Sequence, residues 1–111
     1  MELCVERQGE VTVVRPDQPR LDAMVAVLFK DRMKAAVEGA GARVVLDLSG
    51  VGFLDSSGLG AVVAVQRFMR AEQRLELAGL TPAVARVFRL TRMEQIFTIH
   101  AGVGDALRAA V

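Results

Sequence analysis

The segment Arg43–Leu48 contains an uninterrupted Val-Val-Leu run and lies between two segments whose apolar residues recur at helical spacing. A strand that is apolar on both faces is typical of a sheet covered on both sides, as in α/β proteins. Helices that separate strands form crossover connections, and crossovers join parallel strands. The sequence therefore predicts an α/β fold with this strand near the centre of the sheet.

The rest of the chain divides into strands and helices around that centre. Leu3–Gln8 and Val11–Arg15 flank Gly9-Glu10 and predict an antiparallel hairpin. Leu75–Ala78 and Ile96–Ile99 are predicted as later strands. Four helices are predicted: from Asp22 as N-cap to Gly39, from the serines after Asp55 to about Gln73, from Pro82 after the Thr81 cap to about Thr91, and over Val103–Val111. We expect one domain over residues 1–111, with a mixed sheet in which an antiparallel N-terminal hairpin precedes parallel strands.

Composition excludes several classes of function. The net charge is +1 with the charges spread along the chain, and there is no Tyr or Trp on which bases could stack, so no nucleic-acid partner is predicted. The single Cys4 and single His100 offer no metal-ligand set, so no metal is predicted. No apolar run is long enough to span a bilayer and no leader pattern opens the chain, so we expect a cytoplasmic protein without a membrane partner.

The one concentrated signal for chemistry is the string DSSGLG at Asp55–Gly60, where a strand turns into a helix. A helix N-terminus presents unpaired N–H groups and a partial positive charge, which suit either a capping hydroxyl or a phosphate. Ser57 is predicted to cap the helix and Ser56 to stay exposed to a kinase. Gly58 and Gly60 have no side chain, so they are predicted to let the backbone of a partner approach this surface closely. A well-capped helix start without further function is the alternative, and spacing alone does not decide between them.

The helix after this string is apolar nearly all round over Leu59–Val65. A helix that lies on a sheet with one side in water normally alternates apolar and polar residues. Either both of its sides are buried within the domain or part of its surface meets another protein. Both interpretations remain open at this point.

Other chemistry is disfavoured. A serine hydrolase would need His100 as the base, and the serines lack the G-x-S-x-G context, so the chain is not predicted to be an enzyme. The glycine-rich pieces lack the phosphate-loop lysine, so no nucleotide cofactor is predicted. His100 is interpreted as a surface or edge residue. The four internal methionines are interpreted as core residues, with the option that an exposed one serves an adaptable interface: Met24, Met33, Met69 and Met93.

Three segments carry a resemblance to a known family: Val44–Gly60 (VVLDLSGVGFLDSSGLG), Leu80–Thr91 (LTPAVARVFRLT), and Leu21-Asp22 with Ala26. The sequence resembles the anti-sigma factor antagonists of the STAS-domain family. The resemblance implies a switch in which the unphosphorylated antagonist binds an anti-sigma factor that is also a serine kinase of the ATP-binding, histidine-kinase-like type. That kinase phosphorylates the first serine of the motif, which matches Ser56, and a metal-dependent serine phosphatase reverses the reaction.

The implied partner-binding face consists of Asp22, Asp55, Ser56, Ser57, Gly58, Leu59 and Gly60. The sequence departs from the family at two places. Pro19-Arg20 stands where members usually carry Gly-Glu, so an acidic contact has become basic, and Arg92 stands where a glycine usually follows the third helix, which predicts a different helix end. The alternative function is a STAS domain that is not phosphorylated and serves as a structural or regulatory subunit of a transport or sensory assembly.

Overall fold

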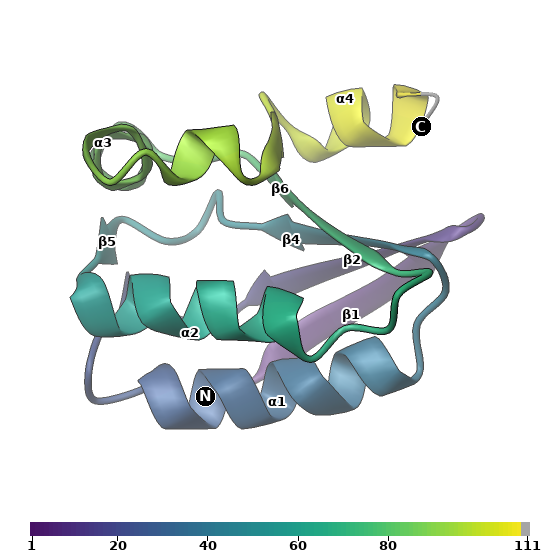
Figure 1. Ribbon diagram of the computed structural model, residues 1–111, viewed down its shortest axis with the longest axis horizontal. Coiled ribbons are helices and arrows are strands. Elements are labelled where there is room, and N and C mark those ends of the chain that lie inside the picture. The colour runs from purple at the N-terminus through teal and green to yellow at the C-terminus, as the bar shows by residue number, and fades with distance from the viewer. Residues whose placement is uncertain (110–111) are drawn as a thin grey trace.

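The computed structural model describes residues 1–109 and contains a five-stranded mixed sheet (Figure 1). The strand order is β1-β2-β4-β6-β7. Its strands are β1 (Leu3–Gln8), β2 (Val11–Pro16), β4 (Arg43–Asp47), β6 (Arg74–Ala78) and β7 (Thr98–His100). A separate two-stranded ladder joins β3 (Arg20–Leu21) to β5 (Phe53–Leu54). The helices are α1 (Ala26–Glu38), α2 (Ser56–Arg67), α3 (Pro82–Leu90) and α4 (Val103–Arg108), with a short 3₁₀ turn η1 (Met93–Gln95) after α3.

The predicted mixed sheet is confirmed. β1 and β2 pair antiparallel around the Gly9-Glu10 turn, while β2–β4, β4–β6 and β6–β7 all pair parallel. Val45 of the central strand stands between Val13 and Glu76. The Val-Val-Leu run of β4 is fully buried, as a strand covered on both faces requires.

Both faces of the sheet are covered, but unequally. α1 and α2 lie side by side along one face (Figure 1), and their buried residues join the main core together with Val84 and Phe88 of α3. α4 packs on the other face, where Ala106 meets a small apolar cluster: Val11, Val13, Val45 and Ala78. Within residues 1–109, none of the helices has the length and apolarity needed to cross a membrane.

Several predicted boundaries are wrong. α1 begins at Ala26 with Val25 as its N-cap, because the Asp22 carbonyl accepts the N–H groups of Val25 (3.1 Å) and Ala26 (2.9 Å) in a preceding turn. α2 ends at Arg67 rather than near Gln73, whose side-chain amide instead donates to the carbonyl of Val37 (2.9 Å) at the end of α1.

The last two elements also differ from the prediction. The strand predicted at Ile96–Ile99 is Thr98–His100, because η1 and the turn after it use the backbone up to Phe97. The helix predicted over Val103–Val111 ends at Arg108. Residues 110–111 of that prediction lie outside the described residues.

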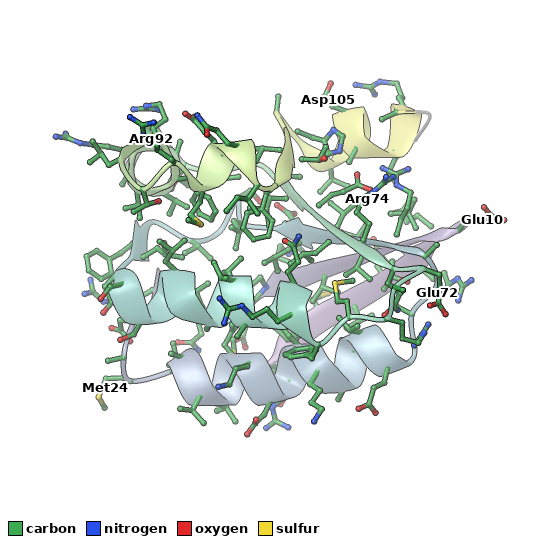
Figure 2. The ribbon with its side chains drawn as sticks, in the orientation of Figure 1. Glu10, Met24, Glu72, Arg74, Arg92 and Asp105 are labelled. Atoms are coloured by element: carbon green, nitrogen blue, oxygen red, sulfur yellow. The ribbon has the colours of Figure 1, made fainter. Side chains whose placement is uncertain are left out.

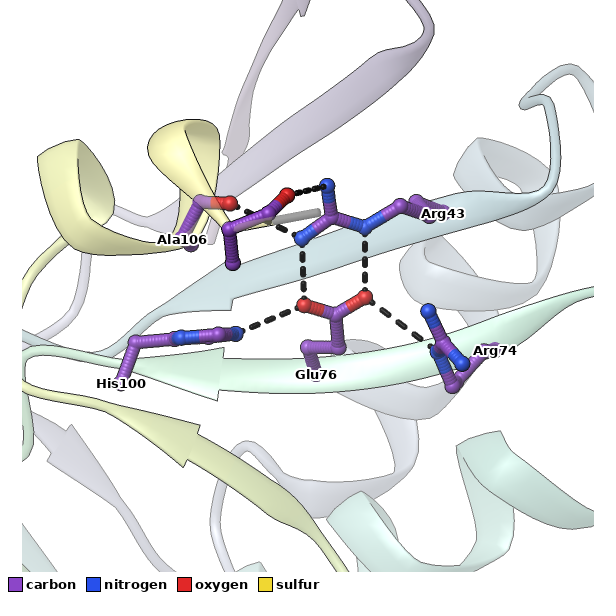
Figure 3. Close-up of polar contacts among 6 residues, drawn as sticks. Arg43, Arg74, Glu76, His100 and Ala106 are labelled. Atoms are coloured by element: carbon purple, nitrogen blue, oxygen red, sulfur yellow. Dashed lines mark hydrogen bonds and ion pairs between the residues drawn. The ribbon is translucent and has the colours of Figure 1, made fainter. Parts of the chain in front are cut away.

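A cluster of charged side chains fastens α4 to the sheet (Figure 3). Glu76 is completely buried and accepts two hydrogen bonds from Arg43, at 2.7 and 2.6 Å, and one from Arg74 at 3.4 Å. His100 contributes a 2.7 Å contact to the same carboxylate. Arg43 also donates to the carbonyls of Ala106 (2.9 Å) and Ala109 (3.3 Å), so one guanidinium joins β4, β6 and the end of α4.

Candidate functional site

The β3–β5 ladder brings the two halves of the predicted site together. Arg20 pairs with Phe53 and Leu21 with Leu54, so Asp22 and Asp55 are the residues that follow two paired strands. The ladder extends one step further, because the Asp55 N–H donates to the Leu21 carbonyl at 3.3 Å. Residues 33 apart in sequence are thereby placed next to each other.

Asp55 is the cap of α2. Its Oδ1 accepts from the N–H of Gly58 at 2.9 Å, and its Oδ2 accepts from the N–H of Ala23 at 3.3 Å. The same carboxylate therefore stabilises the helix start and fixes the β3–α1 loop against it. The prediction that Ser57 caps the helix is wrong, because Asp55, which has extended backbone angles, holds the cap position.

Ser56 and Ser57 are the first two residues of α2, and both are exposed. At these positions the backbone N–H groups have no partner within the helix, and the partial positive charge of the helix dipole is largest. The position of Ser56 therefore combines access for an enzyme with a backbone environment that accommodates an added phosphate.

Asp22 shapes the neighbouring loop. It is not the N-cap that the sequence predicted; its carboxylate accepts from the N–H of Met24 at 3.1 Å and from Nε of Arg20 at 3.3 Å. The Arg20 guanidinium also lies 4.0 Å from the ring centre of Phe53. The aromatic ring and the carboxylate together hold this cation in place, while more than half of its side chain stays exposed.

The two glycines of the motif have different roles. Gly58 is buried, and a Cβ at this position would collide with the Leu21 carbonyl, with only 2.8 Å to its carbon. The prediction that Gly58 lowers the outer surface for a partner is therefore wrong, because this glycine lets α2 approach β3. Gly60 is exposed, and a Cβ there would meet no atom within 4 Å.

The outer side of α2 forms one wall of a groove. Its inner residues Ala61, Val62 and Val65 are buried in the core, while Leu59 and Val63 are only half-buried. The α2–η1 groove has a volume of about 410 Å³ and is lined by Ser56, Leu59, Gly60, Val63, Ala64, Arg67, Met93 and Ile96. The all-round apolarity of α2 therefore has two causes, since one side is core and the other lines an open groove that begins at Ser56.

Several large apolar side chains are exposed where the sequence favours burial or does not single them out. Met24 is not the core residue that the sequence favours; it is 89% exposed and projects from the β3–α1 loop (Figure 2), which fits the alternative of an exposed methionine at an interface. Leu90 at the end of α3 and Ile96 after η1 are 73% and 56% exposed. The exposure of Met24 could have been inferred from helical spacing. The buried residues of α1 recur every four residues at Phe29, Met33 and Val37, and Met24 does not fall on that repeat.

Arg92 keeps the backbone conformation that a glycine would adopt. Its φ is 61°, and within residues 1–109 it is the one residue other than glycine with a positive φ. The prediction that α3 ends differently because glycine is absent is wrong, because the left-handed turn is still made and leads into η1 (Arg92 is labelled in Figure 2).

His100 lies in the charged cluster of the sheet. It lines a hollow of about 450 Å³ between α3 and β7 together with Arg89 and Glu94, and neither serine borders that hollow. Its Nε2 contacts Glu76 at 2.7 Å, and among residues 1–109 no serine is hydrogen-bonded to His100, as the base of a hydrolase would require. Residues 1–109 contain no group of three side chains suited to hold a metal ion.

Comparisons with known proteins identify the family of this chain. Residues 2–106 match the STAS domain family. The anti-sigma-B factor antagonist of Listeria monocytogenes is 31% identical over 86 residues, which are 77% of this chain and 75% of that protein. The crystal structure of an anti-sigma factor antagonist from Mycobacterium paratuberculosis has a TM-score of 0.85 at 28% identity, covering 95% of this chain and 89% of that one.

A third similar structure is that of the Bacillus cell fate determinant SpoIIAA in its phosphorylated form. It has a TM-score of 0.67 at 23% identity, covers 95% of this chain and 96% of that one, and shows the shared fold. Family match, sequence identity and fold agree, and the chain belongs to the STAS-domain family, among relatives that are anti-sigma factor antagonists.

Proposed function

We propose that this chain is a partner-switching protein that binds an anti-sigma factor and is released from it by phosphorylation of Ser56. The partner is a serine kinase with an ATP site of the histidine-kinase-like type, and a metal-dependent serine phosphatase reverses the modification. The observation that carries the proposal is the exposed Ser56 hydroxyl at the first position of α2, at one end of the apolar α2–η1 groove.

The reaction needs only an acceptor from this chain. The Ser56 oxygen attacks the γ-phosphorus of ATP, a new O–P bond forms, the bond between the β- and γ-phosphates breaks, and ADP leaves. The hydroxyl proton passes to a base of the kinase. Asp55 fixes the acceptor, because its carboxylate bonds hold both the helix start and the β3–α1 loop.

The phosphate changes the binding face through its charge. It carries about −1.5 to −2 charges at neutral pH. The N–H groups at the start of α2 accommodate that charge, but a partner packed into the neighbouring groove would have to bury it. The surface expected to lose its partner includes Asp22, Asp55, Ser57, Leu59 and Gly60, whereas Gly58 acts from within the fold.

The test is incubation of the intact protein with ATP and the anti-sigma factor kinase of the same genome, followed by intact-mass measurement and peptide mapping. We expect the mass of one phosphate on Ser56, none on Ser56→Ala, and normal modification of the matched control Ser57→Ala. Modification of Ser57 instead, or none with any such kinase, would contradict the switch and favour a constitutive STAS subunit.

Binding gives a second readout. Ser56→Ala is expected to bind the kinase as tightly as the wild type, while Ser56→Asp weakens binding by about tenfold, a change of about 1.4 kcal/mol. Equal affinities for the two variants would count against a charge-controlled interface.

A further inference from the structure

We propose that a second groove, between α1 and α2, binds an acidic helix of the same partner kinase. The α1–α2 groove consists of two hollows of about 180 and 340 Å³ that meet at Lys30. It is lined by Ala26, Val27, Lys30, Asp31 and Lys34 from α1 and by Ser57, Gly60, Ala61, Ala64, Arg67 and Phe68 from α2 and its end. The inference rests on the proposed function, because it assigns a further contact to the partner of Ser56.

The charges of the α1–α2 groove are unbalanced. Lys30, Lys34 and Arg67 face it with Asp31 as its one carboxylate. Within residues 1–109, none of these three cations is within ion-pair distance of an acid. Five arginines on other surfaces do have ion-pair partners, as Arg70 does in Glu72 at 3.1 Å. Unpaired cations gathered along one groove favour an anionic occupant.

The spacing of the cations fits a helix. Lys30 and Lys34 are four residues apart on α1, so their side chains leave the helix one turn, about 6 Å, apart. Carboxylates separated by one turn on a docked helix would meet both lysines, and Arg67 approaches from the opposite wall. Phe68 lies 11 residues after Ser57, a rise of about 16 Å or three helical turns.

The walls of the α1–α2 groove also offer apolar contact. The residues that α2 contributes to the lining include the small Gly60, Ala61 and Ala64, so a docked helix can approach closely. Val27 lines the groove and is 67% exposed, whereas Phe29 and Met33 on the same helix are completely buried. The occupant is therefore expected to be amphipathic, with acidic residues beside small apolar ones.

α2 separates the two grooves and links both to phosphorylation. Ser56 lines the α2–η1 groove and Ser57 lines the near end of the α1–α2 groove, while Gly60, Ala64 and Arg67 border both. A partner that holds α2 from both sides places an acidic helix beside the phosphoacceptor. A doubly charged phosphate at that end repels the acidic helix, so the same modification weakens both contacts.

The test is the affinity of the purified kinase for the double variant Lys30→Glu with Lys34→Glu. The control is Arg32→Glu, which reverses one charge on α1, as each of the two lysine substitutions does, at a position that does not line the groove. We expect the double variant to bind at least tenfold more weakly with a reduced dependence on salt, and the control to bind within twofold of the wild type. If the Lys30→Glu, Lys34→Glu variant fails to fold, the same affinity measurement is made on Lys30→Gln with Lys34→Gln, which removes both charges without reversing them.

Two outcomes separate this inference from the proposed function. If the kinase binds and phosphorylates Ser56 normally in the double variant, the α1–α2 groove is not a contact and the inference fails while the switch stands. If the wild type binds no kinase, both fail. Carbodiimide, which joins lysines directly to carboxylates, supplies the positive identification, because Lys30 and Lys34 are the two lysines of this chain. A cross-link from either lysine to a helix of the kinase supports the inference, and cross-links to loops alone, or none from either lysine, overturn it.

Discussion

Replacing Glu76 with glutamine tests whether the buried cluster of Figure 3 holds the fold together through charge. The substitution keeps the shape of the side chain but removes the negative charge that Arg43, Arg74 and His100 surround. Burial acts to raise the pKa of Glu76, but the hydrogen bonds from Arg43 and His100 and the charges of the two arginines outweigh it and lower the pKa from 4.5 to about 2.

The magnitude follows from that pKa. Each pKa unit corresponds to about 1.4 kcal/mol, so the ionised carboxylate favours the folded state by about 3 kcal/mol at pH 7. Because the folded pKa is the lower one, this contribution is complete above pH 4.5 and is lost as the pH falls toward 2. At pH 3 about 1 kcal/mol of it remains.

The assay is urea unfolding of the wild type and of Glu76→Gln at pH 7, 4.5 and 3. We expect the variant to be less stable by about 3 kcal/mol at pH 7, with the difference shrinking to about 1 kcal/mol at pH 3. Glu72→Gln is the matched control, because Glu72 pairs with Arg70 on the surface, and its stability is expected to stay close to that of the wild type. A difference that stays constant from pH 7 to 3, or a variant as stable as the wild type, would refute the electrostatic account.

Two backbone positions give further predictions. Gly58→Ala is expected to destabilise the protein by about 1–3 kcal/mol, because the added methyl collides with the Leu21 carbonyl, and thermal unfolding measures the loss. Gly60→Ala, where a Cβ meets nothing, is the control, and an equal loss in both variants would contradict the close approach. Arg92→Gly is expected to stabilise by about 0.5 kcal/mol, because the left-handed conformation costs an arginine more than a glycine, and a lower unfolding midpoint would contradict this.

The sheet was predictable because its signals are local. The Val-Val-Leu run of β4 indicates by itself a buried strand, and the turn residues Gly9-Glu10 indicate by themselves an antiparallel pair. Each predicted helix exists for the same reason, since apolar spacing is a property of the segment itself. The errors lie at the ends of the segments, where contacts from elsewhere in the chain decide which residue stops or starts a helix.

The start of α2 shows why such contacts cannot be predicted from the motif. Asp55, Ser56 and Ser57 are all suited to cap a helix. The Leu21 carbonyl selects Asp55, because it accepts the Asp55 N–H and thereby extends the ladder to this residue before the helix turns. The spacing within DSSGLG contains no information on that pairing, so the exposed serine was predicted correctly while the residue that caps the helix was not.

The charged cluster was hidden for a similar reason. In Arg74–Ala78 the glutamate alternates with leucines, which is the pattern of a strand with one face in water. Its burial depends on Arg43 from the neighbouring strand and on α4, which is separated from it by more than 20 residues. From the sequence alone, a charged residue that alternates with apolar ones indicates a strand face in water. Its burial can be recognised only once the strand and helix that cover it are known.

The separation of the two polar regions bears on how the proposed switch would work. The Glu76 cluster lies on the α4 face of the sheet, whereas Asp55 and Gly58 fix the start of α2 against β3 and the loop after it. Ser56 is exposed and belongs to neither core cluster. A phosphate on Ser56 would therefore leave the packing of the fold intact. Because the start of α2 is fixed from both sides, the partner would meet the same backbone in both states, and the difference in affinity would come from the added charge.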